Sequence, residues 1–179
     1  MADPGTRLAA PVDMSFRVQL PIAVIAISAL VACRPAPEDS ALHDAMQTVL
    51  SGNVEGAKDV WTETGRFYNA RANAPAWVTG LGKVPQGDAI LSALGDADSH
   101  GLPGDYGRDA IMAAIVAAGE GNGTLDERAD QIARLDVRIT TSLLSLAHDV
   151  ALGRTSPSGI ASSWKPRRMP PDFVALLSA

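Results

Sequence analysis

The side chains in this sequence that could carry covalent or metal chemistry are few and lie far apart. Cys33 is the one cysteine, which excludes an internal disulfide and any multi-cysteine metal site. The three histidines, His43, His100 and His148, are spaced too widely to form a metal-binding motif. We therefore predict no metal site and no cofactor.

Two acidic residues, Asp105 and Asp136, have the right chemistry for a general acid and base. Nothing in the sequence places them in a cleft, and we expect helix capping or ion pairing from them instead. Arg154 is interpreted in the same way, as the partner of an acidic side chain and not as a ligand for substrate.

The densest group of large side chains lies between Phe67 and Trp77, where a predicted helix meets a proline. Residues spaced three or four apart give this helix one face (Val60, Trp61, Thr64, Phe67, Tyr68 and Arg71). Pro75 excludes helical geometry from the residue before it, so the helix must end by about Asn73. We expect the aromatic rings to fill the core. Arg71, drawn in among them, must be paired because an unpaired buried charge is costly, and Asp136 is its expected partner.

The composition indicates an all-α protein, a small bundle of helices or a set of orthogonal helices. The 179 residues are 46% hydrophobic but only 4% aromatic, with Ala and Leu as the main apolar types, which favours helices over a sheet sandwich. The formal charge is −5 and no block of Lys and Arg is present, which argues against nucleic acid as a partner.

The first 32 residues are predicted to be a signal peptide. Arg17 precedes the apolar run Leu20–Ala32, which is shorter than the roughly 20 residues that a bilayer span needs. The run ends in Leu-Val-Ala-Cys, which resembles the lipobox of bacterial lipoproteins. This resemblance implies cleavage before Cys33 and lipidation of its sulfur, so that acyl chains anchor the protein in a membrane.

The residue after the cysteine is Arg34, and the lipoprotein sorting rule then implies the periplasmic face of the outer membrane. The alternative is an ordinary secretory signal and a secreted or periplasmic protein with one idle cysteine. Met14 begins a more typical leader than Met1 does. Residues 33–39 are interpreted as a tether, and residues 40–179 as the folded domain.

Within this domain, apolar periodicity and capping residues predict a series of helices. One is capped by Asp39 or Ser40 and ends at Gly52, and the next spans Val54–Asn73. The others are a helix capped by Asp88 that ends before Gly101, the helix Asp109–Ala118, the long helix Asp126–Leu152 with Gly153 after it, and Phe173–Leu177 opened by Asp172. Asp136 and Thr140 share a stripe next to the apolar one, so Asp136 is expected to turn inward.

Three short stretches in this order resemble the scaffold domain of the larger L,D-transpeptidases of diderm bacteria. The matching positions are Phe67, Tyr68, Arg71, Pro75 and Trp77, then His100, Gly101, Leu102, Asp105 and Tyr106, and then Asp136, Thr140, Gly153, Arg154 and Pro157. The resemblance covers roughly Leu42 to Leu177. It implies the helical, non-catalytic part of an enzyme that cross-links peptidoglycan, with structural or binding roles for these residues and with the domain truncated at its C-terminal end.

The nucleophile motif of that family is Ser-His-Gly-Cys, in a catalytic domain that we expect to be absent here. Ser99, His100 and Gly101 are followed by Leu102, which has no thiol, so we predict no catalytic residue in the chain. The first hypothesis is a lipoprotein that binds peptidoglycan, or pairs with a catalytic L,D-transpeptidase, and organises cross-linking or remodelling. The alternatives are the N-terminal fragment of a complete L,D-transpeptidase and a generic helical lipoprotein.

Overall fold

The computed structural model describes residues 36–52, 57–154 and 170–178, and it is helical as predicted. Among the described residues there is no strand, and Thr79 and Lys83 form one isolated bridge. The helices are α2 (Pro37–Ser51), α3 (Lys58–Ala70), α4 (Gly87–Gly95), the 3-10 helix η1 (Asp96–His100), α5 (Arg108–Glu120), α6 (Leu125–Leu152) and α8 (Phe173–Ser178).

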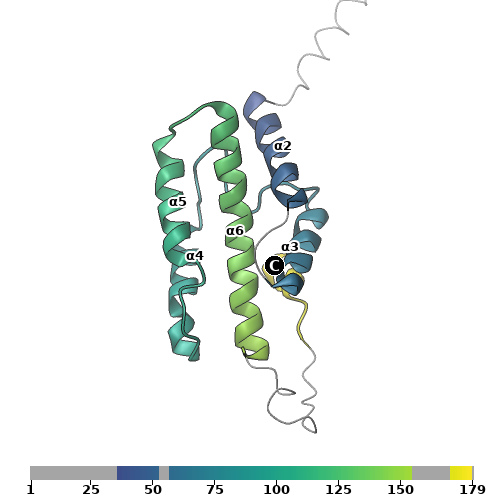
Figure 1. Ribbon diagram of the computed structural model, residues 1–179, viewed down its shortest axis with the longest axis vertical. Helices are drawn as coiled ribbons and strands as arrows, with labels where there is room; N and C mark the ends of the chain where they lie inside the picture. Colours follow the sequence, from purple (N-terminus) through teal and green to yellow (C-terminus); the bar gives the residue numbers. More distant parts are fainter. Residues whose placement is uncertain (1–35, 53–56, 155–169, 179) are drawn as a thin grey trace, which may run out of the picture. The chain divides into compact units, whose positions relative to one another are not determined.

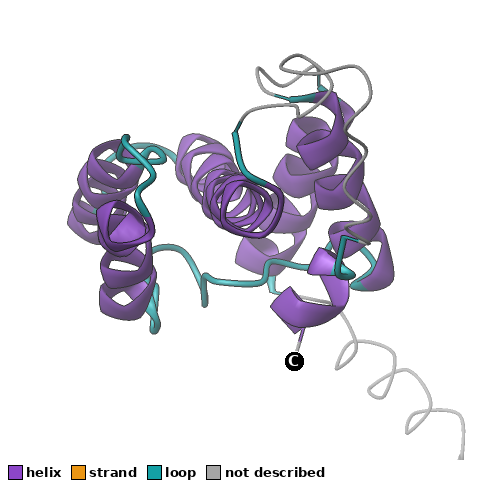
Figure 2. Ribbon diagram, turned by 90° about the horizontal axis from the view of Figure 1, so that it is seen from below, coloured by secondary structure: helices purple, strands orange, loops and turns teal. Residues whose placement is uncertain are grey.

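The long helix α6 is the axis on which the other helices pack. It contacts α2, α3 and α8 on one side and α4 and α5 on the other. Figure 1 shows this order across the domain, and Figure 2, which looks along α6, shows the two groups of helices flanking it. None of the helices that the structure describes is long and apolar enough to cross a membrane.

The core is built on the apolar face of α6 that the sequence predicted. Ala129, Ile132, Leu135 and Ile139 are almost completely buried, whereas Val150 near the C-terminal end of the stripe is 47% exposed. The other helices supply the remaining core side chains, chiefly Leu42, Met46, Phe67, Tyr68, Ile90, Leu94 and Ile111. Each large apolar side chain contributes about 1.5–3 kcal/mol when fully buried, so the domain depends on this face.

Several helix ends confirm the capping residues that were predicted. Gly101 adopts a left-handed φ of 71° and Leu102 behind it is buried, as expected of a C-terminal stop. Gly153 ends α6, and Asp172 accepts hydrogen bonds from the backbone of Val174 and Ala175 at the start of α8.

Two predicted N-terminal caps are wrong. Helix α2 starts earlier than expected, with Pro37 in its first turn and Ala36 at the cap, so Asp39 and Ser40 already lie inside the helix. Proline is well suited to this position because its fixed φ is helical and the missing N–H has no partner there in any case. Asp88 also lies inside the first turn of α4, and Gln86 is the cap.

Three predicted helices differ in extent. Helix α3 spans Lys58–Ala70 and ends three residues before Asn73, and the expected start at Val54 lies outside the described residues. The segment expected to be one helix up to Gly101 changes at Asp96 from α-helix to 3-10 geometry. Helix α5 is slightly longer than Asp109–Ala118 at both ends.

Candidate functional site

The carboxylate of Asp136, on the inward side of α6, is the acceptor at the centre of the domain. Its Oδ1 accepts the Tyr68 hydroxyl at 2.5 Å and the Ala76 backbone N–H at 3.0 Å. Its Oδ2 accepts the backbone N–H groups of Trp77 at 2.8 Å and Val78 at 3.0 Å. The Asp136 side chain therefore joins α6 to α3 and to the loop that follows Pro75.

Thr140, one turn along α6, completes this arrangement. Its Oγ1 lies 2.8 Å from the Tyr68 hydroxyl and accepts the indole N–H of Trp77 at 2.8 Å. Because Tyr68 gives its one hydroxyl proton to Asp136, the Thr140 hydroxyl proton is shared between the phenol oxygen and the Asp136 backbone carbonyl, which lies 3.3 Å from Thr140 Oγ1. We call these residues, Tyr68, Ala76, Trp77, Val78, Asp136 and Thr140, the Asp136 centre.

The electrostatics of the Asp136 centre make it stable and unreactive. Tyr68, Asp136 and Thr140 have no exposed surface, and among the described residues no buried side-chain nitrogen or oxygen lacks a hydrogen-bond partner. Burial, and then the charge and hydrogen bond of Asp136, raise the pKa of the Tyr68 phenol well above its ordinary value of 10.0. A fully satisfied buried carboxylate of this kind holds secondary structure together. It offers no accessible acid or base to a substrate.

The predicted ion pair between Arg71 and Asp136 is wrong. Arg71 is the C-terminal cap of α3 and is exposed, with its guanidinium carbon 5.5 Å from the centre of the Phe67 ring. Its Nη2 donates to the Pro75 carbonyl at 3.3 Å. Backbone N–H groups and a phenol take the place that was expected for the guanidinium, so Asp136 needs no cation.

A second, smaller cluster joins Tyr106 and Arg154, which come from the other two predicted stretches, through Asp149. The Tyr106 hydroxyl donates to Oδ2 of Asp149 at 2.7 Å, and Arg154 Nε lies 3.3 Å from the same oxygen. Arg154 also donates to the Pro103 carbonyl at 2.6 Å. Burial, followed by the hydrogen bond and charge of Asp149, raises the pKa of Tyr106. This cluster fastens the loop before α5 to the C-terminal end of α6.

The structure brings His100, Gly101, Leu102 and Asp105 into the turn between η1 and α5. His100 ends η1 and is exposed, and the apolar side chain of Leu102 is buried. Asp105 accepts the backbone N–H of Gly107 at 3.1 Å and so shapes the turn before α5. The segment Ser99–Leu102, which resembles a nucleophile motif with leucine in place of cysteine, is thus the end of a helix.

Sequence reasoning missed Asp149 and a pair formed by His148 and Glu63. The His148 Nε2 lies 2.9 Å from Glu63 Oε2, and its ring stacks on Phe173 of α8 with 4.2 Å between ring centres. The signal for Asp149 was its place in the last turn of a helix, where a negative charge is unfavourable unless a donor or cation compensates it.

The remaining predicted positions either shape the backbone or lie outside the described residues. Pro75 lies in the loop and its carbonyl accepts Arg71, and Gly153 caps α6. Cys33 and Pro157 lie outside the described residues. In the part of the chain that the structure describes, no group of three or more His, Cys, Asp and Glu side chains could hold a metal ion.

Comparison with known proteins gives one match. The family model described as Scaffold domain matches residues 62–179, a range that contains the whole Asp136 centre. No curated protein and no solved structure matches the chain significantly. The chain therefore belongs to the scaffold-domain family, in agreement with its resemblance to the scaffold domain of the large L,D-transpeptidases.

Proposed function

We propose that this chain acts in the bacterial cell envelope as a non-catalytic protein that binds peptidoglycan and organises its cross-linking or remodelling. The observation that carries the proposal is the state of the Asp136 centre within a scaffold-family fold. Its carboxylate, phenol and hydroxyl are committed to one another and to the backbone. Such residues position helices, and a domain built in this way contributes by holding a partner in place.

The lone cysteine fits a role in attachment better than a role in acyl transfer. Cysteine catalysis needs a thiolate, and a base such as histidine commonly activates it. In the sequence Cys33 follows an apolar leader, and the nearest histidine is His43. We extend the proposal to lipidation of Cys33 and an anchor at the periplasmic face of the outer membrane. Metabolic labelling with a fatty acid should mark the wild-type chain and not the Cys33→Ser variant, and equal labelling of both would contradict the anchor.

Co-sedimentation with purified sacculi tests the binding role. The full chain, made with Cys33→Ser so that acyl chains play no part, should pellet with intact sacculi and remain in the supernatant after they are digested with a muramidase. Asp136→Ala is the control for folding. It removes the central acceptor and should disrupt the fold, so specific retention should be abolished. If the Cys33→Ser chain stays in the supernatant with intact sacculi, peptidoglycan is not its ligand.

The same experiment distinguishes the other partner considered from the sequence, a catalytic L,D-transpeptidase. Cross-linking of the chain in intact cells, followed by identification of the adducts, should recover peptidoglycan fragments. Recovery of a transpeptidase alone, together with no binding to sacculi, would replace the glycopeptide by an enzyme as the partner.

A further inference from the structure

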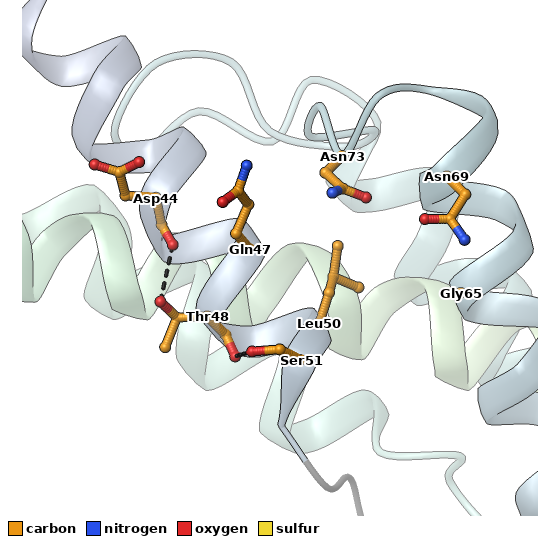
Figure 3. Close-up of a pocket in the computed structure, with 8 residues that line it drawn as sticks. All are labelled: Asp44, Gln47, Thr48, Leu50, Ser51, Gly65, Asn69 and Asn73. Atoms are coloured by element: carbon orange, nitrogen blue, oxygen red, sulfur yellow. Dashed lines mark hydrogen bonds between the residues drawn. The ribbon is translucent and has the colours of Figure 1, made fainter.

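A groove lies on the surface between α2 and α3, apart from the Asp136 centre. It has a volume of about 660 Å³. Figure 3 shows the residues of α2 along one side, those of α3 and its C-terminal turn along the other, and the Leu50 side chain between them. We call it the α2–α3 groove, and its lining residues are Asp44, Gln47, Thr48, Leu50, Ser51, Gly65, Asn69 and Asn73.

The polar groups along this groove are available to a ligand. The side-chain amides of Asn69 and Asn73 make no hydrogen bond to any residue that the structure describes. Gln47 shares its Nε2 with His43 at 2.8 Å, which leaves its carbonyl oxygen as an acceptor. The Thr48 and Ser51 hydroxyls are used within their own helix, because they donate to the Asp44 and Thr48 carbonyls. The lining thus offers both donors and acceptors, most of them on planar amides.

Gly65, near the middle of α3, keeps one wall of the groove open. A Cβ atom at this position would meet nothing within 4 Å, so no packing constraint requires glycine. Alanine is preferred over glycine inside a helix, and the fold would gain from the exchange. Gly65 therefore leaves open space at this wall of the groove, which a larger side chain would fill.

The far end of the groove is formed by the turn that ends α3. Ala72 and Asn73 have φ values of 53° and 59°, in the left-handed region that favours glycine. This conformation turns the chain after α3 and sets Asn73 opposite Gln47 (Figure 3). The Asn73 N–H donates to the Tyr68 carbonyl at 2.8 Å, so the turn that ends α3 also holds the Asn73 side chain at the rim of the groove.

The charge of the lining selects the class of ligand. Asp44 is the only ionisable side chain among the lining residues, and none of them is Lys or Arg. An anionic ligand would meet a carboxylate and no cation, so it is disfavoured. A sugar ring is uncharged, presents hydroxyls that both donate and accept, and suits amides and a single carboxylate.

We propose that the α2–α3 groove binds an uncharged amino-sugar glycan, with Asn69, Asn73 and Gln47 hydrogen-bonding its hydroxyl and acetamido groups. Leu50 supplies an apolar contact for the acetamido methyl group, and Asp44 accepts a hydroxyl proton. The inference rests on the proposed function and deepens it, because it assigns binding to the glycan part of peptidoglycan and not to the peptide stems, which carry carboxylates.

The test is a titration of the full ¹⁵N-labelled chain, carrying Cys33→Ser, with a soluble oligomer of N-acetylglucosamine. Saturable changes in the amide signals of α2 and α3 around the groove are expected. Asn69→Ala should weaken binding about threefold to tenfold, the effect of one lost hydrogen bond. Gly65→Leu should abolish it by filling the groove. The matched control is Gly119→Leu, because Gly119 lies in helix α5 away from the groove and also has nothing within 4 Å of a Cβ.

The outcomes separate this inference from the proposed function. If sacculi retain the wild-type chain but Asn69→Ala and Gly65→Leu bind the oligomer normally, the groove assignment is wrong and the wider role stands. Saturable binding of a free stem peptide in the groove, in place of the glycan, would overturn the choice of ligand. Signal changes confined to other helices would overturn the choice of site.

Discussion

Tyr68 and Asn69 are neighbours in the sequence, yet they lie on different faces of α3, one buried and one exposed. Tyr68 has no exposed surface, and its hydroxyl is shared between Asp136 and Thr140. Asn69 is exposed, and its amide has no partner among the described residues. The same helix therefore presents satisfied polar groups to the core and unsatisfied ones to the groove. The contrast assigns folding to one side of the helix and ligand binding to the other.

The Tyr106–Asp149–Arg154 cluster shows how burial alters the same chemistry. It repeats the tyrosine-to-aspartate hydrogen bond of the Asp136 centre, but the Arg154 and Asp149 side chains are 53% and 26% exposed. Water can replace partners lost from an exposed cluster, whereas it cannot reach the Asp136 centre. The Asp136 centre should therefore contribute more to the free energy of unfolding than the exposed cluster does.

The largest effect is expected from removing the central acceptor. Asp136→Ala leaves the Tyr68 hydroxyl and three backbone N–H groups without it, which should lower the free energy of unfolding by about 3 kcal/mol or more in urea titrations. The control is Asp130→Ala on the same helix, whose carboxylate pairs with Arg134 at the surface and should cost no more than about 1 kcal/mol. Equal losses of stability in the two variants would contradict the assignment of Asp136 as the acceptor on which the fold depends.

Alkaline pH gives the next effect. The pKa of the Tyr68 phenol is raised in the folded protein above its ordinary value of 10.0, chiefly by burial. Above pH 10 the unfolded chain releases this proton while the folded chain keeps it, so stability is retained below pH 10 and lost as the pH rises. The expected slope from Tyr68 is about 1.4 kcal/mol per pH unit. Between pH 9 and about pH 11 the stability of wild type should fall relative to that of Tyr68→Phe, with that slope above pH 10, and parallel curves would refute the explanation.

A gain in stability is expected on the groove side of α3. Gly65→Ala should raise the free energy of unfolding by up to about 1 kcal/mol, because alanine is the better helix former and nothing obstructs its Cβ. Thermal unfolding measures this directly. A loss of stability would mean that Gly65 serves the fold, and it would remove one argument for the groove.

The smallest effect is expected from Arg71→Ala. An exposed side chain with one hydrogen bond of 3.3 Å and a ring contact with Phe67 should contribute only about 0.5–1 kcal/mol. Denaturant unfolding would show this as a small shift in midpoint. A loss as large as that of Asp136→Ala would restore the buried ion pair that the sequence suggested.

The sequence predicted the helices well because their signals are local. The apolar repeat along Asp126–Leu152 and the glycines at 101 and 153 specify where helices run and end, and the structure agrees within a residue or two. The inward turn of Asp136 followed from its stripe on the same helix. These features depend on spacing along one segment, which a single sequence displays.

The partners of Asp136 and the groove could not be predicted in this way. Backbone N–H groups at residues 76–78 have no signature in residue types, so Arg71 was the plausible but wrong partner. Ala72 and Asn73 adopt left-handed φ values although neither residue is glycine, which residue types alone do not predict. The groove needs α2 beside α3, which is a property of the folded domain.

The most direct test of this division is the dissociation constant of the N-acetylglucosamine oligomer for Tyr68→Phe, measured beside Asn69→Ala. The account predicts that Tyr68→Phe folds less stably but binds the glycan like the wild type, whereas Asn69→Ala keeps its stability and loses affinity. Weakened binding in folded Tyr68→Phe, with Asn69→Ala unchanged, would contradict it.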